Sequence, residues 1–274
     1  MTISIPDTFS ADLSGKYIMS IRLCTDGLSF SAYNPEKAQS FFYREVVFDR
    51  GTPYLALLGD LFFENEIFTQ TYKRVNVFFV TPQYTLAPDE MLPDERKTDL
   101  FSFNFSTPAK RILCNPVKEN CNVVFGVDEE VYDFCSRSLS DPVYYHHITP
   151  QLQVLTTQIQ SEKQNHLFVT AHREVVDIIG FKEDRLVFVN TFDYQQSDDL
   201  LYYILYVWQQ LEMNQLTDRL SFSGRNTALC NKGYLSLQNY VQHVGKTEIP
   251  SEAYLIGGEI LQAPLDLILQ TVCE

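Results

Sequence analysis

The chain has 274 residues, 45% of them hydrophobic, and a formal net charge of −14 at pH 7. This hydrophobic content excludes an intrinsically disordered chain, and the length fits two domains of about 140 residues each. The excess of acidic side chains would repel a polyanion, so nucleic acid is not an expected partner.

The amino terminus has no cationic segment followed by an apolar run, so the sequence predicts no secretion signal. No uncharged apolar run approaches the roughly 18 to 20 residues that a membrane-spanning helix needs, so no membrane insertion is expected. The six cysteines show no Cys-x-x-Cys spacing, and most lie in apolar segments. This pattern indicates reduced core residues in a cytoplasmic protein.

The first part of the chain is predicted to form a three-stranded antiparallel meander, a helix and a further strand. Asp26-Gly27 lies between two strand-like runs, which is a strong hairpin signal. Thr52 and Pro53 supply a cap and a first-turn proline for a helix with apolar residues at helical spacing. The strands are expected at residues 17–23, 28–33, 42–48 and 75–80.

The middle of the chain is predicted to hold a strand at residues 122–127, a helix at 128–139 and a strand at 143–148, before a helix start at Thr149-Pro150. The acidic, proline-containing stretch 88–99 is interpreted as a solvated excursion. We expect the domain boundary within residues 149–164, which gives an N-terminal domain of residues 1–150 and a C-terminal domain of residues 151–274.

The last part of the chain repeats the order of the first. Its predicted helix begins at Ser197, where acidic residues of the first turn complement the helix dipole, and runs to about Met213. A fourth strand and a second helix follow. The strands are expected at residues 167–171, 174–179, 186–191 and 219–224, and the second helix at residues 229–244. Two copies of one strand-strand-strand-helix-strand-helix plan indicate an internal duplication.

This doubled plan resembles the actin-like ATPase fold, also called the ribonuclease H-like duplication. More closely, the segments IRLCTDGLSFSAYN and LFVTAHREVVDIIGFKEDRLVFVNTFDYQQSDDLLYYILYVWQQLEM are similar to a bacterial family of unknown function assigned to that fold. The resemblance implies an α/β protein of two βββαβα-type domains with mixed sheets. It implies no known substrate, cofactor or partner.

Working members of the actin-like fold hold ATP between their two domains, with an Asp-x-Gly hairpin whose backbone N–H groups bind phosphate and whose aspartate positions magnesium. Here Asp26 and Gly27 are adjacent rather than separated, and Leu28 replaces a small residue, so an ordinary hairpin turn is favoured. Gly224 stands where a glycine-rich adenosine loop would follow a strand. Gly257-Gly258 is interpreted as a turn. The nucleotide-binding residues therefore look degenerate.

The matching turn of the second copy contains His172 and Arg173 instead of an aspartate and a glycine. Bulky side chains there would block a phosphate from the backbone, although the two residues could attract another anion.

Other chemistry is weakly supported. His146 and His147 are neighbours in a predicted strand, and alternation sends them to opposite faces, one packed and one exposed, so they cannot share one metal ion. No residues mark a reactive cysteine. Asp177 and Asp193 are interpreted as solvent-facing strand residues, and a nuclease would need several such acids converging on metal.

The predicted helix LLYYILYVWQQL is apolar around most of its circumference. Its core stripe leaves Tyr202 and Tyr206 stacked on a neighbouring flank, with Tyr203 beyond them. Either another part of the chain or a protein partner must cover this flank.

The sequence thus favours a cytoplasmic, catalytically inactive actin-like protein that acts as an interaction or assembly module, with an unknown protein partner and no cofactor. The alternative is a divergent ATPase or sugar kinase-like phosphotransferase that uses ATP and magnesium in an interdomain site. That site would use Asp26 and Gly27 near the phosphates and Gly224 near the base.

Overall fold

The computed structural model describes residues 3–49, 51–92, 97–106, 111–118, 120–160, 164–224 and 227–273. The chain divides into two compact units, and each unit is made of two segments. The first unit comprises Met1–Thr149 and Ser251–Ala263, and the second comprises Pro150–Pro250 and Pro264–Glu274. The sequence predicts continuous domains and gives no sign of this return of a short segment to the first unit.

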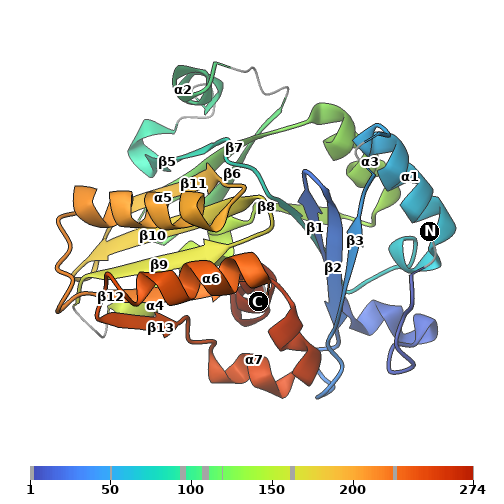
Figure 1. Ribbon diagram of the computed structural model, residues 1–274. Helices are drawn as coiled ribbons and strands as arrows, with labels where there is room; N and C mark the ends of the chain where they lie inside the picture. Colours follow the sequence, from blue (N-terminus) through green and yellow to red (C-terminus); the bar gives the residue numbers. More distant parts are fainter. Residues whose placement is uncertain are drawn as a thin grey trace. The chain divides into compact units, whose positions relative to one another are not determined.

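The first unit contains a five-stranded mixed sheet of order β3-β2-β1-β4-β8 (Figure 1). Strands β1 to β3 form the predicted antiparallel meander, and β4 and β8 run parallel to β1. The predicted strands are therefore confirmed within a few residues. The strands are β1 (Ile18–Cys24), β2 (Gly27–Tyr33), β3 (Phe42–Val47), β4 (Arg74–Phe79) and β8 (Pro142–His146).

Helices of the first unit cover its sheet with aromatic side chains. Phe62 stacks on Phe68 with ring centroids 4.5 Å apart and meets Phe134 at 5.2 Å, and Phe68 meets the buried Phe30 of β2 at 5.0 Å. Burial of these large rings stabilises the unit through the hydrophobic effect and edge-to-face contacts. The helices are η1 (Ala11–Lys16), α1 (Tyr54–Glu64), η2 (Glu66–Phe68) and α3 (Glu129–Ser138).

The start of α1 differs in detail from the prediction. Pro53, rather than Thr52, is the N-cap residue, and its carbonyl oxygen accepts hydrogen bonds from the N–H groups of Ala56 and Leu57. In α3 the cap is a side chain, because the Asp128 carboxylate accepts hydrogen bonds from the N–H groups of Glu130 and Val131.

A second sheet of the first unit has the order β5-β7-β6 and is antiparallel. Only β7 of these three strands is predicted from the sequence, because the polar residues and prolines of the other two obscure their alternation. Residues 93–96 of the predicted solvated excursion lie outside the described residues. The elements here are β5 (Tyr84–Pro88), η3 (Asp89–Met91), α2 (Lys97–Asn104), β6 (Arg111–Val117) and β7 (Cys121–Val127).

The second unit contains a five-stranded sheet of order β11-β10-β9-β12-β13, which matches the strand order of the first unit position for position. Helices α5 and α6 lie across one face (Figure 1), and an apolar core that includes Leu167, Ile204 and Trp208 fills the space beneath them. Helix α4 contacts the other face. The elements are α4 (Ile148–Ile159), β9 (His166–Ala171), β10 (Val175–Lys182), β11 (Arg185–Asp193), α5 (Ser197–Gln210), β12 (Arg219–Gly224), α6 (Ala228–Leu237), β13 (His243–Lys246) and α8 (Leu265–Cys273).

Two predictions for the second unit are wrong in extent. Helix α5 ends at Gln210 rather than near Met213, and the predicted helix 229–244 is a shorter helix, α6, followed by strand β13. Val241 and Val244 pack against the same core as Leu237, so helical and strand spacings both fit this stretch. Residues 243–246 form a strand rather than a helix because they pair with β12.

The segment Ser251–Ala263 attaches to the edge of the first unit's sheet next to β3. It contains α7 (Ser251–Leu255) and η5 (Gly258–Gln262). The Phe41 N–H donates to the Ile256 carbonyl oxygen at 2.9 Å, and Arg44 pairs with Glu259 at 3.0 Å. Gly257 has a φ of 151° and precedes η5, which begins at Gly258, so the predicted turn at Gly257-Gly258 is the start of a 3-10 helix. Among the described residues, no helix has the length and apolarity needed to cross a bilayer.

Candidate functional site

The first hairpin holds Asp26 and Gly27 in a turn that belongs to the sheet. Cys24 pairs with Gly27, so Thr25 and Asp26 form a two-residue turn, and the Asp26 carbonyl oxygen accepts a hydrogen bond from the Phe48 N–H at 2.9 Å. Gly27 has a φ of 150°, and a Cβ atom at this residue would lie 2.1 Å from the carbonyl oxygen of Val46. The glycine is therefore required by the close approach of β3.

Gly224 ends strand β12 and is also explained by packing. It pairs with Ala171 of β9, and an added Cβ would lie 3.0 Å from the Phe222 ring and 3.2 Å from the Ala171 Cβ. Residues 225 and 226 of the predicted adenosine loop lie outside the described residues. Thr227 caps α6 by accepting a hydrogen bond from the Cys230 N–H at 3.2 Å.

In the second hairpin, between β9 and β10, the backbone groups of the turn form hydrogen bonds with other groups of the same chain. The His172 N–H donates to the Val175 carbonyl oxygen at 2.9 Å, and the Tyr194 hydroxyl donates to the His172 carbonyl oxygen. His172 is buried, whereas Arg173 is exposed. The sequence suggests this pair as an anion site, and in the structure the His172 Nε2 atom lies 2.7 Å from the Asp177 carboxylate.

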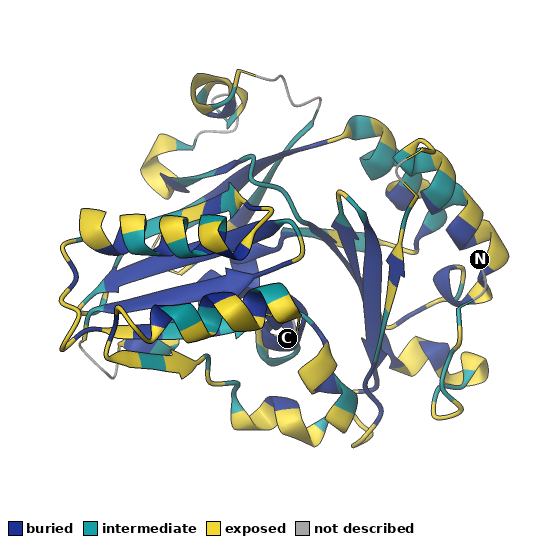
Figure 2. Ribbon diagram, in the orientation of Figure 1, coloured by how far each residue is buried: buried dark blue, intermediate teal, exposed yellow. Residues whose placement is uncertain are grey.

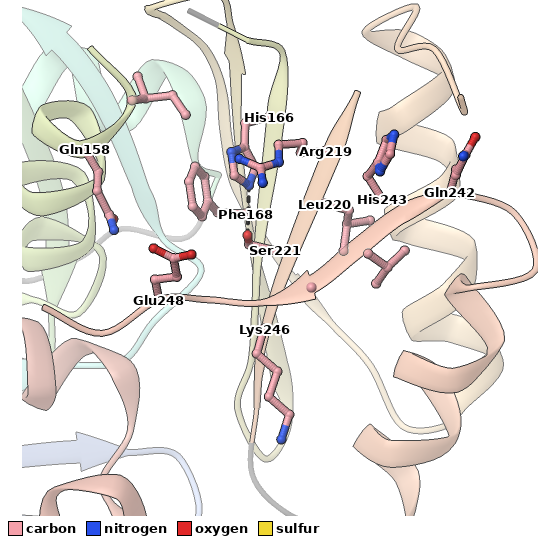
Figure 3. A pocket seen from close by; sticks show the side chains of 13 residues that line it. Gln158, His166, Phe168, Arg219, Leu220, Ser221, Gln242, His243, Lys246 and Glu248 are labelled. Atoms are coloured by element: carbon pink, nitrogen blue, oxygen red, sulfur yellow. Dashed lines mark hydrogen bonds between the residues drawn. The ribbon is translucent and has the colours of Figure 1, made fainter. Parts of the chain in front are cut away.

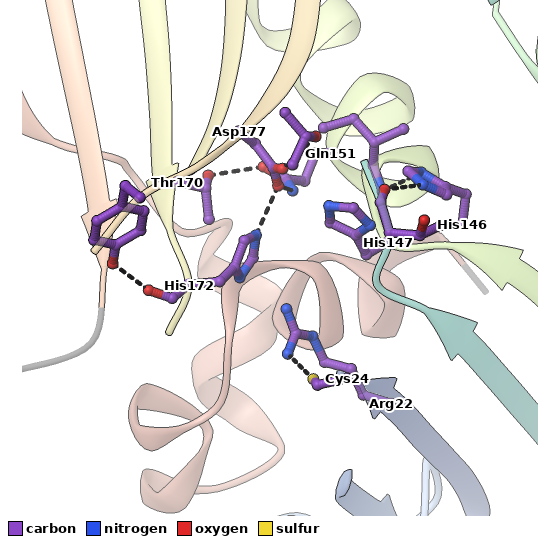
Figure 4. A network of polar contacts seen from close by, with 12 residues as sticks. Arg22, Cys24, His146, His147, Gln151, Thr170, His172 and Asp177 are labelled. Atoms are coloured by element: carbon purple, nitrogen blue, oxygen red, sulfur yellow. Dashed lines mark hydrogen bonds and ion pairs between the residues drawn. The ribbon is translucent and has the colours of Figure 1, made fainter. Parts of the chain in front are cut away.

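Asp177 is the centre of a buried polar network in the second unit (Figure 4). Its carboxylate, with no exposed surface, accepts hydrogen bonds from Gln151 Nε2 and Thr191 Oγ1, each at 2.8 Å, in addition to the His172 contact. The Gln151 Oε1 atom in turn accepts a hydrogen bond from Thr170 at 2.8 Å. The prediction of a solvent-facing Asp177 is wrong, whereas Asp193 is exposed as predicted.

The strand register explains how the network forms. Asp177 lies directly opposite Thr170 of β9 and Thr191 of β11, so three polar side chains form one row across adjacent strands. Gln151, in the first turns of α4, reaches this row from above the sheet. The row could have been found from the sequence by aligning the three predicted strands, because each contributes one polar residue to an otherwise apolar face.

His146 and His147 do not point to opposite faces, and both are fully buried. Strand β8 ends at His146, so alternation does not extend to the next residue, and the two ring centroids are 4.4 Å apart. The Nε2 atom of His146 lies 2.9 Å from the Thr81 carbonyl oxygen, and its Nδ1 accepts from the Ile148 N–H at 3.3 Å. This pattern suits a neutral ring that donates through Nε2.

None of the six cysteines, all of which lie in the described residues, forms a disulfide bond. Burial raises the pKa of the Cys135 thiol to about 12, so this residue is held as an unreactive thiol. Cys230 is also buried, whereas Cys273 is exposed and the other three are partly buried. The prediction of core cysteines therefore holds for Cys135 and Cys230 only.

Helix α5 presents an aromatic surface to solvent. Its core stripe is buried as predicted, whereas the Tyr202 and Tyr206 side chains are 61% and 47% exposed. Figure 2 shows exposed positions in yellow along α5. The two rings stack with centroids 5.9 Å apart. Tyr203 is partly buried and stacks on Phe192 of β11 at 4.6 Å. Tyr202 and Tyr206 therefore form an exposed, stacked pair, which we call the tyrosine pair.

Comparison with known proteins gives a family and a fold. A family model described as protein of unknown function (DUF3822) matches residues 6–244. A protein of Bacteroides thetaiotaomicron VPI-5482, described as having an actin-like ATPase fold and unknown function, is 27% identical. The alignment covers 99% of this chain and 100% of that chain, with a TM-score of 0.81.

A chain of the PilM-PilN type IV pilus biogenesis complex is 13% identical over 93% of this chain and 98% of that chain, with a TM-score of 0.58. At this identity the likeness concerns the fold alone. A search of curated proteins gave no match. The protein has the actin-like ATPase fold, and it belongs to the DUF3822 family of proteins of unknown function.

Proposed function

We propose that this protein is a catalytically inactive member of the actin-like fold that binds another protein through the second unit. The tyrosine pair is the observation that carries the proposal. Two aromatic rings on a well-packed helix offer a large contact area at little cost in side-chain entropy, and tyrosine is enriched at the energetic centres of protein interfaces.

The expected partner surface is basic. The chain carries a net charge of −14, and Asp198 and Asp199 occupy the first turn of α5. Arginine and lysine side chains on a partner would complement this charge and could stack on the tyrosine rings. The PilM-PilN complex contains a protein of the same fold together with a partner protein, which makes such a use of the fold plausible by analogy.

The packing around the two candidate nucleotide-binding glycines disfavours the alternative of a divergent ATPase or phosphotransferase. Gly27 is accounted for by the Val46 carbonyl oxygen and Gly224 by the Phe222 and Ala171 side chains. At the second hairpin, the His172 N–H that could face a phosphate donates to Val175 instead. These two glycines and the His172 N–H are therefore accounted for without a nucleotide.

A thermal-shift and calorimetry experiment separates the two functions. With ATP or ADP and magnesium at about 1 mM we expect no stabilisation, whereas a ligand present at 100 times its dissociation constant would stabilise the folded protein by about 2.7 kcal/mol. Clear stabilisation that is lost in Asp26→Ala but kept in the exposed-site control Asp12→Ala would overturn the inactive assignment.

Capture of partners from a lysate tests the tyrosine pair. The double variant Tyr202→Ala/Tyr206→Ala is expected to capture at least tenfold less of a protein that the wild type retains, since truncation of an interface hot-spot residue costs about 2 kcal/mol or more. Tyr240→Ala is the matched control, because its side chain has the same 47% exposure as Tyr206 in the same unit.

The thermal stability of the double variant must be measured alongside. Because both rings are largely exposed, we expect a stability within about 0.5 kcal/mol of wild type. A large loss of stability would show that the pair serves folding. Equal capture by wild type and a folded double variant would also contradict the proposal.

A further inference from the structure

The second unit contains a cavity of about 320 Å³ that none of the preceding observations uses. It lies over strands β9, β12 and β13, on the face opposite the core beneath α5 and α6, and the end of α4 borders it. Its volume is at the lower end of the range typical of small-molecule sites. The cavity therefore suits a compact ligand.

Strand register builds the floor of the cavity from two rows of side chains. His166, Arg219 and His243 face one another across β9, β12 and β13, and the next row on the same face holds Phe168, Ser221 and Gly245. The His166 Nε2 atom lies 2.8 Å from the Ser221 hydroxyl, and the His166 ring stacks on Phe168 at 4.0 Å. This contact fixes a flat, aromatic surface at the base of the cavity.

Charges of both signs line the cavity, from Arg219, Lys246 and Glu248. Figure 3 shows the Arg219 guanidinium beside His166, and the Glu248 carboxylate and Gln158 amide to one side of them. Burial, with a smaller effect of Arg219, lowers the pKa of His166 to about 4. His166 is therefore neutral at pH 7, and Arg219 is the fixed positive charge of its row.

Gly245 of β13 leaves the floor of the cavity open beside Ser221. No atom lies within 4 Å of the place where a Cβ atom would sit on this residue. A glycine with neither a steric neighbour nor a positive φ is not required by packing. Its effect is to keep the strand backbone accessible next to Ser221.

We propose that this cavity binds a small bipolar molecule that carries a carboxylate or phosphate at one end and an amine at the other. Arg219 and the Ser221 hydroxyl receive the anionic group, because a guanidinium binds such groups through paired hydrogen bonds. Glu248 and Gln158 receive the ammonium group. The Phe168 and His166 rings contact the short carbon chain between them.

Matched probes test each end of the ligand. The carboxylate series is γ-aminobutyrate, which carries both groups, together with butyrate and butylamine, which each carry one. Phosphoethanolamine gives the phosphate arm. By calorimetry we expect at least one bipolar probe to bind with a dissociation constant of about 1 mM and at least tenfold more tightly than either single-ended probe.

Four variants assign the binding to the cavity. Gly245→Leu fills the open space and is expected to abolish binding, and Arg219→Gln is expected to weaken the bipolar probes at least tenfold. Glu248→Gln should remove the difference between the dissociation constants of γ-aminobutyrate and butyrate. Arg185→Gln is the control, since Arg185 begins β11 at the opposite edge of the same sheet. This variant should bind the bipolar probes with the affinity of the wild type.

The fold of each variant is checked by the melting temperature and by the fluorescence of Trp208, the single tryptophan of the chain. If neither bipolar probe binds saturably to the wild type at about 10 mM, the proposal is overturned. Binding that persists in folded Gly245→Leu also overturns it, because the ligand then lies elsewhere. Preference for phosphoethanolamine over γ-aminobutyrate would identify a phosphate rather than a carboxylate ligand.

Discussion

Replacement of Asp177 by alanine is expected to lower the free energy of unfolding of the second unit by about 3 to 5 kcal/mol. The carboxylate has no exposed surface and accepts hydrogen bonds from Gln151 and Thr191 while it contacts His172. Its removal leaves these buried donors without their acceptor. The cost is therefore well above that of an average substitution.

Denaturant unfolding followed by Trp208 fluorescence measures this effect. Trp208 is the only tryptophan, is buried in the core of the second unit, and therefore reports on the unit that contains Asp177. Asp193→Ala is the matched control, because Asp193 is an exposed aspartate on the neighbouring strand, and it should change stability by less than about 0.5 kcal/mol. Equal midpoints for the two variants would show that the network contributes little to stability.

The outcome also bears on the second hairpin. His172 is one of the two residues that the sequence predicts as a site for an anion, and the structure places its Nε2 atom against Asp177. If Asp177→Ala frees this nitrogen, an added anion such as formate should restore part of the lost stability by taking the place of the carboxylate. Such rescue would show that the hairpin positions His172 for a carboxylate from within the chain.

The fold could be predicted because the segments that form the two five-stranded sheets have clear strand and helix patterns in the sequence. The runs that became β1, β2, β9 and β12 alternate or are continuously apolar, and Asp26-Gly27 marks the first turn. The three-stranded sheet was missed because β5 and β6 carry prolines and polar residues, which weaken the alternation that identifies a strand.

The candidate site was less predictable because its contacts are long-range. Asp177, Thr170 and Thr191 become neighbours through strand register, and Gln151 joins them from a helix that precedes the strands. A single aspartate in a strand is more often exposed, so only the aligned row distinguishes it. The cavity has the same origin, since Arg219 and Gly245 lie 53 and 79 residues after His166 in the sequence and meet it only in the sheet.

Replacement of Gly27 by alanine is expected to destabilise the first unit by at least about 3 kcal/mol. The new Cβ atom would lie 2.1 Å from the Val46 carbonyl oxygen, and the φ of 150° is itself unfavourable for alanine. Strand β3 would have to move away from β2, which breaks hydrogen bonds at the end of the meander. Hydrogen exchange of the amides of β2 and β3 should increase strongly, together with a lower melting temperature.

Gly15→Ala is the control for this substitution, because Gly15 belongs to the same unit and has no atom within 4 Å of its Cβ position. It should be within about 1 kcal/mol of wild type and could be stabilising. The comparison separates two reasons for a glycine at residue 27. If the glycine serves a bound phosphate, alanine would leave the stability of the ligand-free protein nearly unchanged. If it serves the packing of β3 on β2, the ligand-free protein is itself destabilised, and the resemblance to an Asp-x-Gly phosphate turn is only one of letters.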